Sequence, residues 1–147
     1  MQKGLLIFII LVSALLAACS NQPSQNKIST SEGVGKVISV EGGTYRDITV
    51  AELENMLEHK DFLLVNTHIP FEGDLLNTDL SIPFDEITQN LDKLPADKNA
   101  KIVLYCRSGR MSRIAAKELV KLGYTNLWQL DGGFNAWKDA GLPMADQ

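Results

Sequence analysis

The chain has 147 residues, of which 45% are hydrophobic, so it is long enough for one domain with a core and a short additional segment. Its 14 basic and 18 acidic side chains give a formal net charge of −4. This acidic balance argues against a nucleic-acid partner, which needs a basic surface, and against membrane attachment through a polybasic patch.

The N-terminus carries the pattern of an export signal. Lys3 is followed by an apolar run over residues 5–16 and then by small residues up to Cys19. An uncleaved transmembrane anchor is the alternative, but about a dozen apolar residues fall short of the roughly 20 that a spanning helix needs. A signal peptide over residues 1–18 is therefore the preferred interpretation.

The segment Leu16-Ala17-Ala18-Cys19 resembles a bacterial lipobox. The resemblance implies that Cys19 becomes the acylated first residue of an exported lipoprotein. Its lipid would anchor the protein to the outer face of a bacterial membrane, which is the periplasmic side in a cell with two membranes. Residues 19–44 are rich in Ser, Asn, Gln and Gly and predict a flexible tether, which leaves residues 45–147 as the folded domain.

Helical and strand patterns alternate along this domain. Thr49 and Glu52 form a capping box that predicts a helix ending near His59. Short apolar runs predict buried strands. The strands are expected at residues 62–65, 80–83, 101–105 and 127–130, and further helices at residues 85–91, from about 110 to a C-terminal glycine at 123, and around 134–137. This alternation predicts an α/β domain with an open, twisted parallel sheet and helices on both faces.

Cys106 lies between the strand at 101–105 and the helix that follows it. Ligands of open parallel sheets bind beyond the carboxyl ends of the strands. The loop amides, the helix dipole and three arginines, at positions 107, 110 and 113, would favour a thiolate and attract an anionic sulfur compound. A buried structural cysteine is the alternative, but such basic neighbours are typical of a surface. With Cys19 acylated, Cys106 has no disulfide partner, so a reactive surface thiol is predicted.

Two motifs resemble the single-domain rhodanese family. Val103–Ser112 is similar to its active-site strand and loop, and Leu130–Trp137, with Gly141-Leu142-Pro143, to its C-terminal signature; the similarity covers about Tyr45 to Met144. It implies a sulfurtransferase that takes sulfur from a donor such as thiosulfate, holds it as a persulfide on the catalytic Cys106, and passes it to a thiol or another nucleophile. It also implies a substrate-binding loop made of Arg107, Ser108, Gly109, Arg110, Met111 and Ser112. In this family Gly132 and Gly133 would shape the neighbouring turn.

No cofactor is implied by this resemblance. One cysteine and two well-separated histidines also do not make a metal-ligand set, so no metal site is predicted.

One segment departs from the family. Asn66-Thr67-His68 stands where rhodaneses usually carry Asp-Val-Arg, and Leu76–Leu80 has no clear match to their Gly-His-Ile-Pro segment. An ion pair at the pocket rim is therefore missing or replaced. His68 and Glu72 are candidates to replace it, although ordinary loop solvation is the favoured interpretation of both. The loop after Pro70 is expected to line the mouth of the site, so the donor can differ from thiosulfate.

Two other functions compete with sulfur transfer. A phosphatase or arsenate reductase needs Cys and Arg separated by five residues, but Ser112 occupies that place and the arginines stand four and seven positions after Cys106. A non-catalytic partner-binding module at the cell surface is the other alternative, with apolar residues such as Phe71 and Leu76 as a docking surface. Such modules usually lose the cysteine, which this chain retains.

Overall fold

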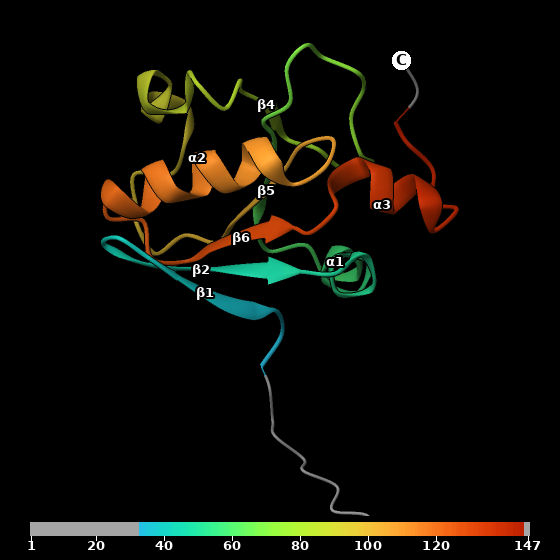
Figure 1. Ribbon diagram of the computed structural model, residues 1–147, viewed down its shortest axis with the longest axis horizontal. Coiled ribbons are helices and arrows are strands. Elements are labelled where there is room, and N and C mark those ends of the chain that lie inside the picture. Colours follow the sequence, from blue (N-terminus) through green and yellow to red (C-terminus); the bar gives the residue numbers. More distant parts are fainter. Residues whose placement is uncertain (1–32, 146–147) are drawn as a thin grey trace, which may run out of the picture. The chain divides into compact units, whose positions relative to one another are not determined.

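The structure is a computed structural model that describes residues 33–145, so the expected signal peptide and Cys19 lie outside the described residues. A six-stranded sheet in the order β1-β2-β6-β5-β3-β4 forms the centre of the fold (Figure 1). Five strands run parallel and β1 is antiparallel to β2. The strands are β1 (Lys36–Val40), β2 (Gly43–Ile48), β3 (Leu63–Asn66), β4 (Leu80–Ser81), β5 (Ile102–Tyr105) and β6 (Leu127–Leu130). The predicted α/β fold is confirmed, with one antiparallel edge strand added.

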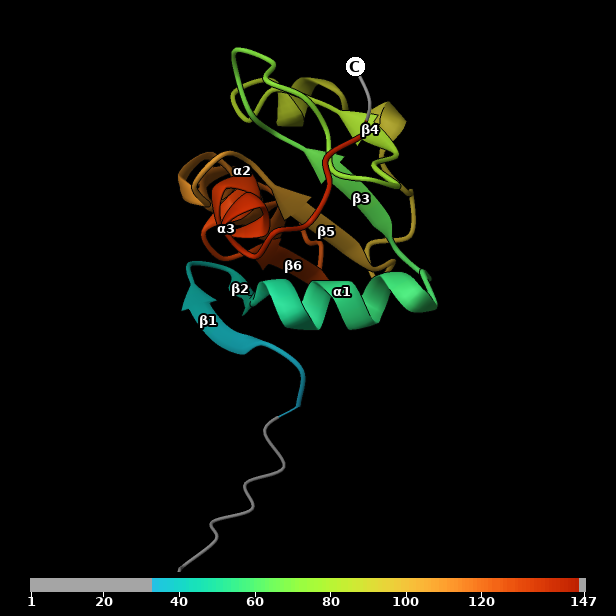
Figure 2. The same cartoon turned by 90° about the vertical axis from the view of Figure 1, so that its right-hand side faces the viewer.

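Helices cover both faces of the sheet, as predicted (Figures 1 and 2). On one face, α2 (Arg110–Lys121) packs with two single-turn 3-10 helices, η1 (Ile87–Gln89) and η2 (Leu91–Lys93). On the other face lie α1 (Val50–Glu58) and α3 (Gly133–Asp139). The residues of β5 alternate between these two cores, Leu104 into the first and Val103 and Tyr105 into the second. The strand before Cys106 is therefore buried on both faces.

The predicted tether ends before residue 44, because the first strand already begins at Lys36. Residues 36–48 form a hairpin, with pairing from Lys36 opposite Asp47 to Val40 opposite Gly43. The prediction of a flexible segment up to residue 44 is wrong here because Ile38 and Val40 pack against the core beneath α2. The hairpin also brings Asp47 alongside β6, next to the loop that follows β5.

The capping box at the start of α1 is confirmed. The Glu52 amide donates to the Thr49 hydroxyl at 3.3 Å, and the Thr49 amide donates to Glu52 Oε2 at 2.8 Å. Glu52 Oε1 also accepts the Gly35 amide at 2.8 Å, which ties the hairpin to the helix.

The prediction of an α-helix over residues 85–91 is wrong, because this segment forms the two 3-10 helices η1 and η2. Asn90 leaves helical geometry between η1 and η2, and its side chain donates to the Glu86 carbonyl at 2.9 Å. Within residues 33–145, no helix is both long and apolar enough to cross a bilayer.

Candidate active site

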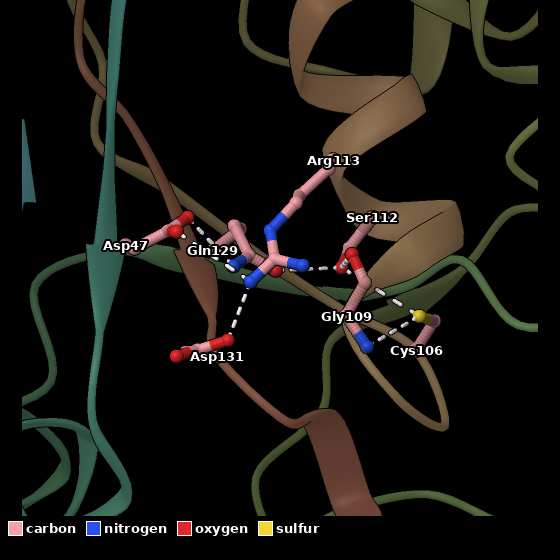
Figure 3. Close-up of polar contacts among 7 residues, drawn as sticks. All are labelled: Asp47, Cys106, Gly109, Ser112, Arg113, Gln129 and Asp131. Atoms are coloured by element: carbon pink, nitrogen blue, oxygen red, sulfur yellow. Dashed lines mark hydrogen bonds and ion pairs between the residues drawn. The ribbon is translucent and has the colours of Figure 1, made fainter. Parts of the chain in front are cut away.

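The predicted nucleophile sits in a tight loop between β5 and α2. Gly109 takes a left-handed conformation with φ +86° and acts as the N-cap of α2. Its amide donates to Cys106 Sγ at 3.1 Å, and the Ser112 hydroxyl lies 3.6 Å from the same sulfur (Figure 3). The single proton of the Ser112 hydroxyl is donated to Gln129 Oε1, so the Gly109 amide is the donor aimed at the sulfur, and it can stabilise negative charge there.

Cys106 itself is buried, with 1% of its surface exposed, so the predicted surface position of the thiol is wrong. The basic residues of the loop indicate the exposure of its outer side but not that of the sulfur. Arg107, Ser108 and Arg110 are exposed, whereas Gly109 and Ser112 are buried with the sulfur. The thiol therefore forms the floor of the loop.

The turn before α3 supports the loop from behind. The Phe134 amide donates to the Cys106 carbonyl at 2.9 Å, and the Asn135 amide donates to the Arg107 carbonyl at 3.0 Å. Gly133 has φ +58°, and a Cβ at this position would lie 2.1 Å from the Cys106 carbonyl oxygen. Only glycine permits this approach, so the Gly-Gly turn acts through the backbone of the Cys106 loop.

A buried polar chain leads away from the sulfur (Figure 3). The Ser112 hydroxyl donates to Gln129 Oε1 at 2.8 Å, and Gln129 Nε2 donates to Asp47 at 2.7 Å. Because a carboxylate only accepts, Asp47 fixes the orientation of the Gln129 amide. Arg113 lies beyond it, paired with Asp131 and 3.5 Å from Asp47. Gln129 therefore positions the hydroxyl nearest the nucleophile.

Sequence reasoning missed Gln129 and Asp47. A usable signal was present, because Gln129 is a polar residue in the otherwise apolar strand β6 and is fully buried. A buried amide needs partners, and those nearby are the loop and β2.

Three side chains from two segments of the chain form the rim of the site. Glu72 Oε1 lies 3.0 Å from Arg107 Nη1 and 3.2 Å from His68 Nε2. The His68 ring packs edge-on against Phe134, and its Nδ1 lies 3.3 Å from Met111 Sδ. His68 is 7% exposed, so ordinary solvation is the wrong interpretation of it, and Glu72 forms an ion pair with Arg107; that this pair replaces the one usual in rhodaneses stays a prediction.

The contacts of the rim have an electrostatic consequence. Contact with the His68 ring, and then the charge of Arg107, hold the pKa of the Glu72 carboxyl below its ordinary value. Glu72 is therefore ionised at neutral pH. His68 Nε2 is close to this carboxylate but misaligned for a hydrogen bond, which leaves it buried without a hydrogen-bond partner among the described residues.

Asp74 organises the unusual segment behind the rim. Its Oδ1 accepts from Asn66 Nδ2 at 2.8 Å, from the Ser81 hydroxyl at 3.0 Å and from the Tyr105 hydroxyl at 3.0 Å. Burial raises the pKa of Tyr105, which keeps that donor protonated. An aspartate at position 66 would face Asp74 with a second carboxylate, so the amide of Asn66 suits this network.

The remaining predicted residues are spread over the outside of the loop. Ser108 and Arg110 make no side-chain hydrogen bond or ion pair to any residue between 33 and 145. Phe71 and Leu76 are exposed, at 59% and 42%, but a docking role for them stays a prediction. The same range contains no group of three or more His, Cys, Asp or Glu residues able to hold a metal ion.

Known proteins share this arrangement to different extents. A protein named sulfurtransferase from Allochromatium vinosum is 32% identical over 93 residues, which cover 62% of this chain and 85% of that protein. An uncharacterized protein of Synechocystis sp. is 32% identical over 104 residues, covering 68% of this chain. The match spans 57% of the Synechocystis protein, so the chain corresponds to little more than half of that relative.

Structural and family comparisons agree on the fold. A crystal structure of a rhodanese-related protein from Thermoplasma volcanium superposes with a TM-score of 0.59 at 28% identity, covering 69% of this chain and 98% of that one. Residues 49–140, more than half of the chain, match the family model of the rhodanese-like domain. The chain therefore belongs to the rhodanese-like family.

Proposed function

We propose that this protein is a sulfurtransferase that carries sulfane sulfur as a persulfide on Cys106. The observation that supports it most is the position of Cys106 directly after the C-terminal end of β5, where the Gly109 amide donates to its Sγ at 3.1 Å. The thiolate attacks the outer sulfur of a donor, the donor's bond to that sulfur breaks, and the donor leaves as an anion. A nucleophilic acceptor then takes the outer sulfur and the thiolate returns.

The loop suits sulfur better than phosphate. Phosphatase-type loops need a guanidinium free to close over an oxyanion. Here Arg107 is paired with Glu72 and Arg113 with Asp131, and the remaining arginine, Arg110, stands four positions after Cys106 instead of six. The outer sulfur of a persulfide carries one charge at most, and the backbone amide of the loop is a donor suited to it.

The closed rim is compatible with turnover. Because Cys106 is almost fully buried, a donor reaches its sulfur only when the rim moves. The Arg107–Glu72 pair that bridges the rim has side chains 53% and 35% exposed. Exposed pairs of this kind contribute about 0–1 kcal/mol, so breaking this pair costs little.

Turnover by the full chain tests the proposal. Purified in detergent and given thiosulfate or an organic persulfide with cyanide as acceptor, the protein should release thiocyanate. Because organic persulfides also react directly with cyanide, the rate without protein is subtracted, and the Cys106→Ala variant should add nothing to that rate. A protein-dependent rate that survives this substitution would assign the activity to another group.

The proposed setting is the outer face of a bacterial membrane, with Cys19 acylated and the lipid as the anchor. It is supported by the lipobox-like segment at residues 16–19. In cells fed a labelled fatty acid, the protein should carry the label, and Cys19→Ser should lose it. Cys106→Ser is the matched control and should stay labelled; normal labelling of Cys19→Ser would refute the anchor.

A further inference from the structure

The positive charge around the Cys106 loop is largely neutralised. Arg107 is paired with Glu72 at 3.0 Å, and Arg113 is paired with Asp131 and lies 3.5 Å from Asp47. Arg110 is the one loop arginine without an ion-pair partner within residues 33–145. The site therefore offers an incoming anion far less net positive charge than its three arginines suggest.

Glu72 is a carboxylate tied directly to the loop of the nucleophile. It is held by the residue after Cys106 and by His68, whose ring contacts Met111 of the same loop. Its side chain is 35% exposed, so it also meets the solvent through which a donor arrives. Glu72 balances the charge of Arg107, so the pair attracts an anion little. Without this carboxylate the guanidinium would attract a dianion more strongly than a monoanion.

We propose that Glu72 determines the donor class: the site selects sulfane-sulfur donors with at most one negative charge, such as organic persulfides, against the thiosulfate dianion. This inference rests on the proposed function of Cys106. With an organic persulfide, the Cys106 thiolate attacks the outer sulfur of R–S–SH, the S–S bond of the donor breaks, and the donor leaves as the thiolate R–S⁻. The outer sulfur keeps its proton, so charge and atoms balance.

Two donors of similar shape isolate the effect of charge. Methanethiosulfonate carries one negative charge and leaves as methanesulfinate, whereas thiosulfate carries two and leaves as sulfite. The wild-type chain, purified in detergent, should have the higher kcat/KM for the monoanion with cyanide as acceptor. In Glu72→Gln, kcat/KM for thiosulfate should rise about tenfold relative to that for methanethiosulfonate.

A matched variant controls for the overall change in charge. Glu118→Gln removes the same charge on α2, where Glu118 pairs with Lys121, and should leave the ratio of the two donors at the wild-type value. Salt is a second measurement that needs no variant. Raising ionic strength from about 0.05 M to about 0.5 M should narrow the wild-type preference because it screens an exposed carboxylate.

The outcomes separate this inference from the proposed function. An unchanged donor ratio in folded Glu72→Gln, or a wild-type preference for thiosulfate, overturns the role of Glu72 while sulfur transfer by Cys106 stands. If Glu72→Gln does not fold, the salt measurement decides. A wild-type preference for the monoanionic donor that does not change with ionic strength overturns the role of Glu72. If neither donor transfers sulfur to the wild-type protein, the proposed function itself fails.

Discussion

The Cys106 loop and the rim segment at residues 66–80 meet at one site but are held in different ways. Main-chain contacts hold the loop, through the carbonyls of Cys106 and Arg107 and the close approach of Gly133. Side chains hold the rim, through Asp74, Glu72 and His68. The family model spans both regions, and the difference fits the departure of the rim segment from the Asp-Val-Arg and Gly-His-Ile-Pro patterns. Side-chain contacts can be exchanged without altering the fold, so the rim can change the donor while the nucleophile stays.

The largest effect is expected at the main-chain support. Gly133→Ala places a Cβ 2.1 Å from the Cys106 carbonyl oxygen at φ +58°, so the turn or the loop must shift. We expect the free energy of unfolding to fall by about 3 kcal/mol or more, with loss of sulfur transfer. Urea denaturation measures the first and thiocyanate release the second.

Gly141→Ala is the matched control for this variant. Gly141 has φ +78°, but no atom lies within 4 Å of its potential Cβ. It should therefore cost only the backbone strain, about 1–2 kcal/mol, and keep its activity. Equal losses in the two variants would show that the contact with the loop is unimportant.

A smaller effect on stability is expected at the rim. Asp74→Ala removes the acceptor of Asn66, Ser81 and Tyr105, and should lower the free energy of unfolding by about 2 kcal/mol. The loop keeps its support from α3, so a persulfide should still form on Cys106. Urea denaturation and mass spectrometry check the two parts. Asp85→Ala, at an exposed position, should be neutral; loss of persulfide formation in Asp74→Ala would contradict the independence of the two regions.

Within the loop, the Ser112 hydroxyl should contribute to rate. Ser112→Ala removes the hydroxyl 3.6 Å from Cys106 Sγ and leaves Gln129 Oε1 without its donor. Persulfide formation should slow about fivefold, as expected when the loop loses one hydrogen bond. Single-turnover kinetics with either donor measures this, with Ser39→Ala on exposed β1 as the control. A wild-type rate in Ser112→Ala would leave the Gly109 amide as the donor that matters.

The smallest effect is a pH dependence at the rim. Because contact with His68 and Arg107 depresses the pKa of Glu72 below its ordinary value of 4.5, the charge persists to lower pH than in the unfolded chain and is lost as pH falls through the folded pKa. The preference for the monoanionic donor should thus be constant from about pH 7 to about pH 5. The measurement is the ratio of the single-turnover rates for the two donors. The ionisation of Cys106 affects both rates equally and therefore cancels in this ratio. A ratio that collapses above pH 5 would contradict an ionised, paired Glu72.

The sequence predicts the elements that carry strong local signals. The capping box of Thr49 and Glu52, the apolar strand before Cys106 and the glycine after α2 each depend on neighbours in the chain. The hairpin was missed because the partner strand, Gly43–Ile48, has the polar composition GTYRDI and is ordered by pairing with β6. Local pattern carries no information on that pairing.

The parts of the site that could not be predicted depend on distant contacts. Arg107 and Glu72 are separated by 35 positions, and Gln129 and Asp47 by 82, with no motif linking either pair. The burial of Cys106 was missed for another reason. The basic residues of the loop indicate only that their own side chains are exposed. The sulfur of Cys106 points to the inside of the turn and is buried.

The most direct test of sulfur transfer by Cys106 is to locate the transferred sulfur atom in the protein. The full chain is incubated with methanethiosulfonate, alkylated and digested, and the peptide containing Cys106 is analysed by mass spectrometry. If Cys106 carries the persulfide, its peptide gains one additional sulfur atom, which cyanide removes when it is added before alkylation. A Cys106 peptide that never gains sulfur from this donor, from an organic persulfide or from thiosulfate would contradict it.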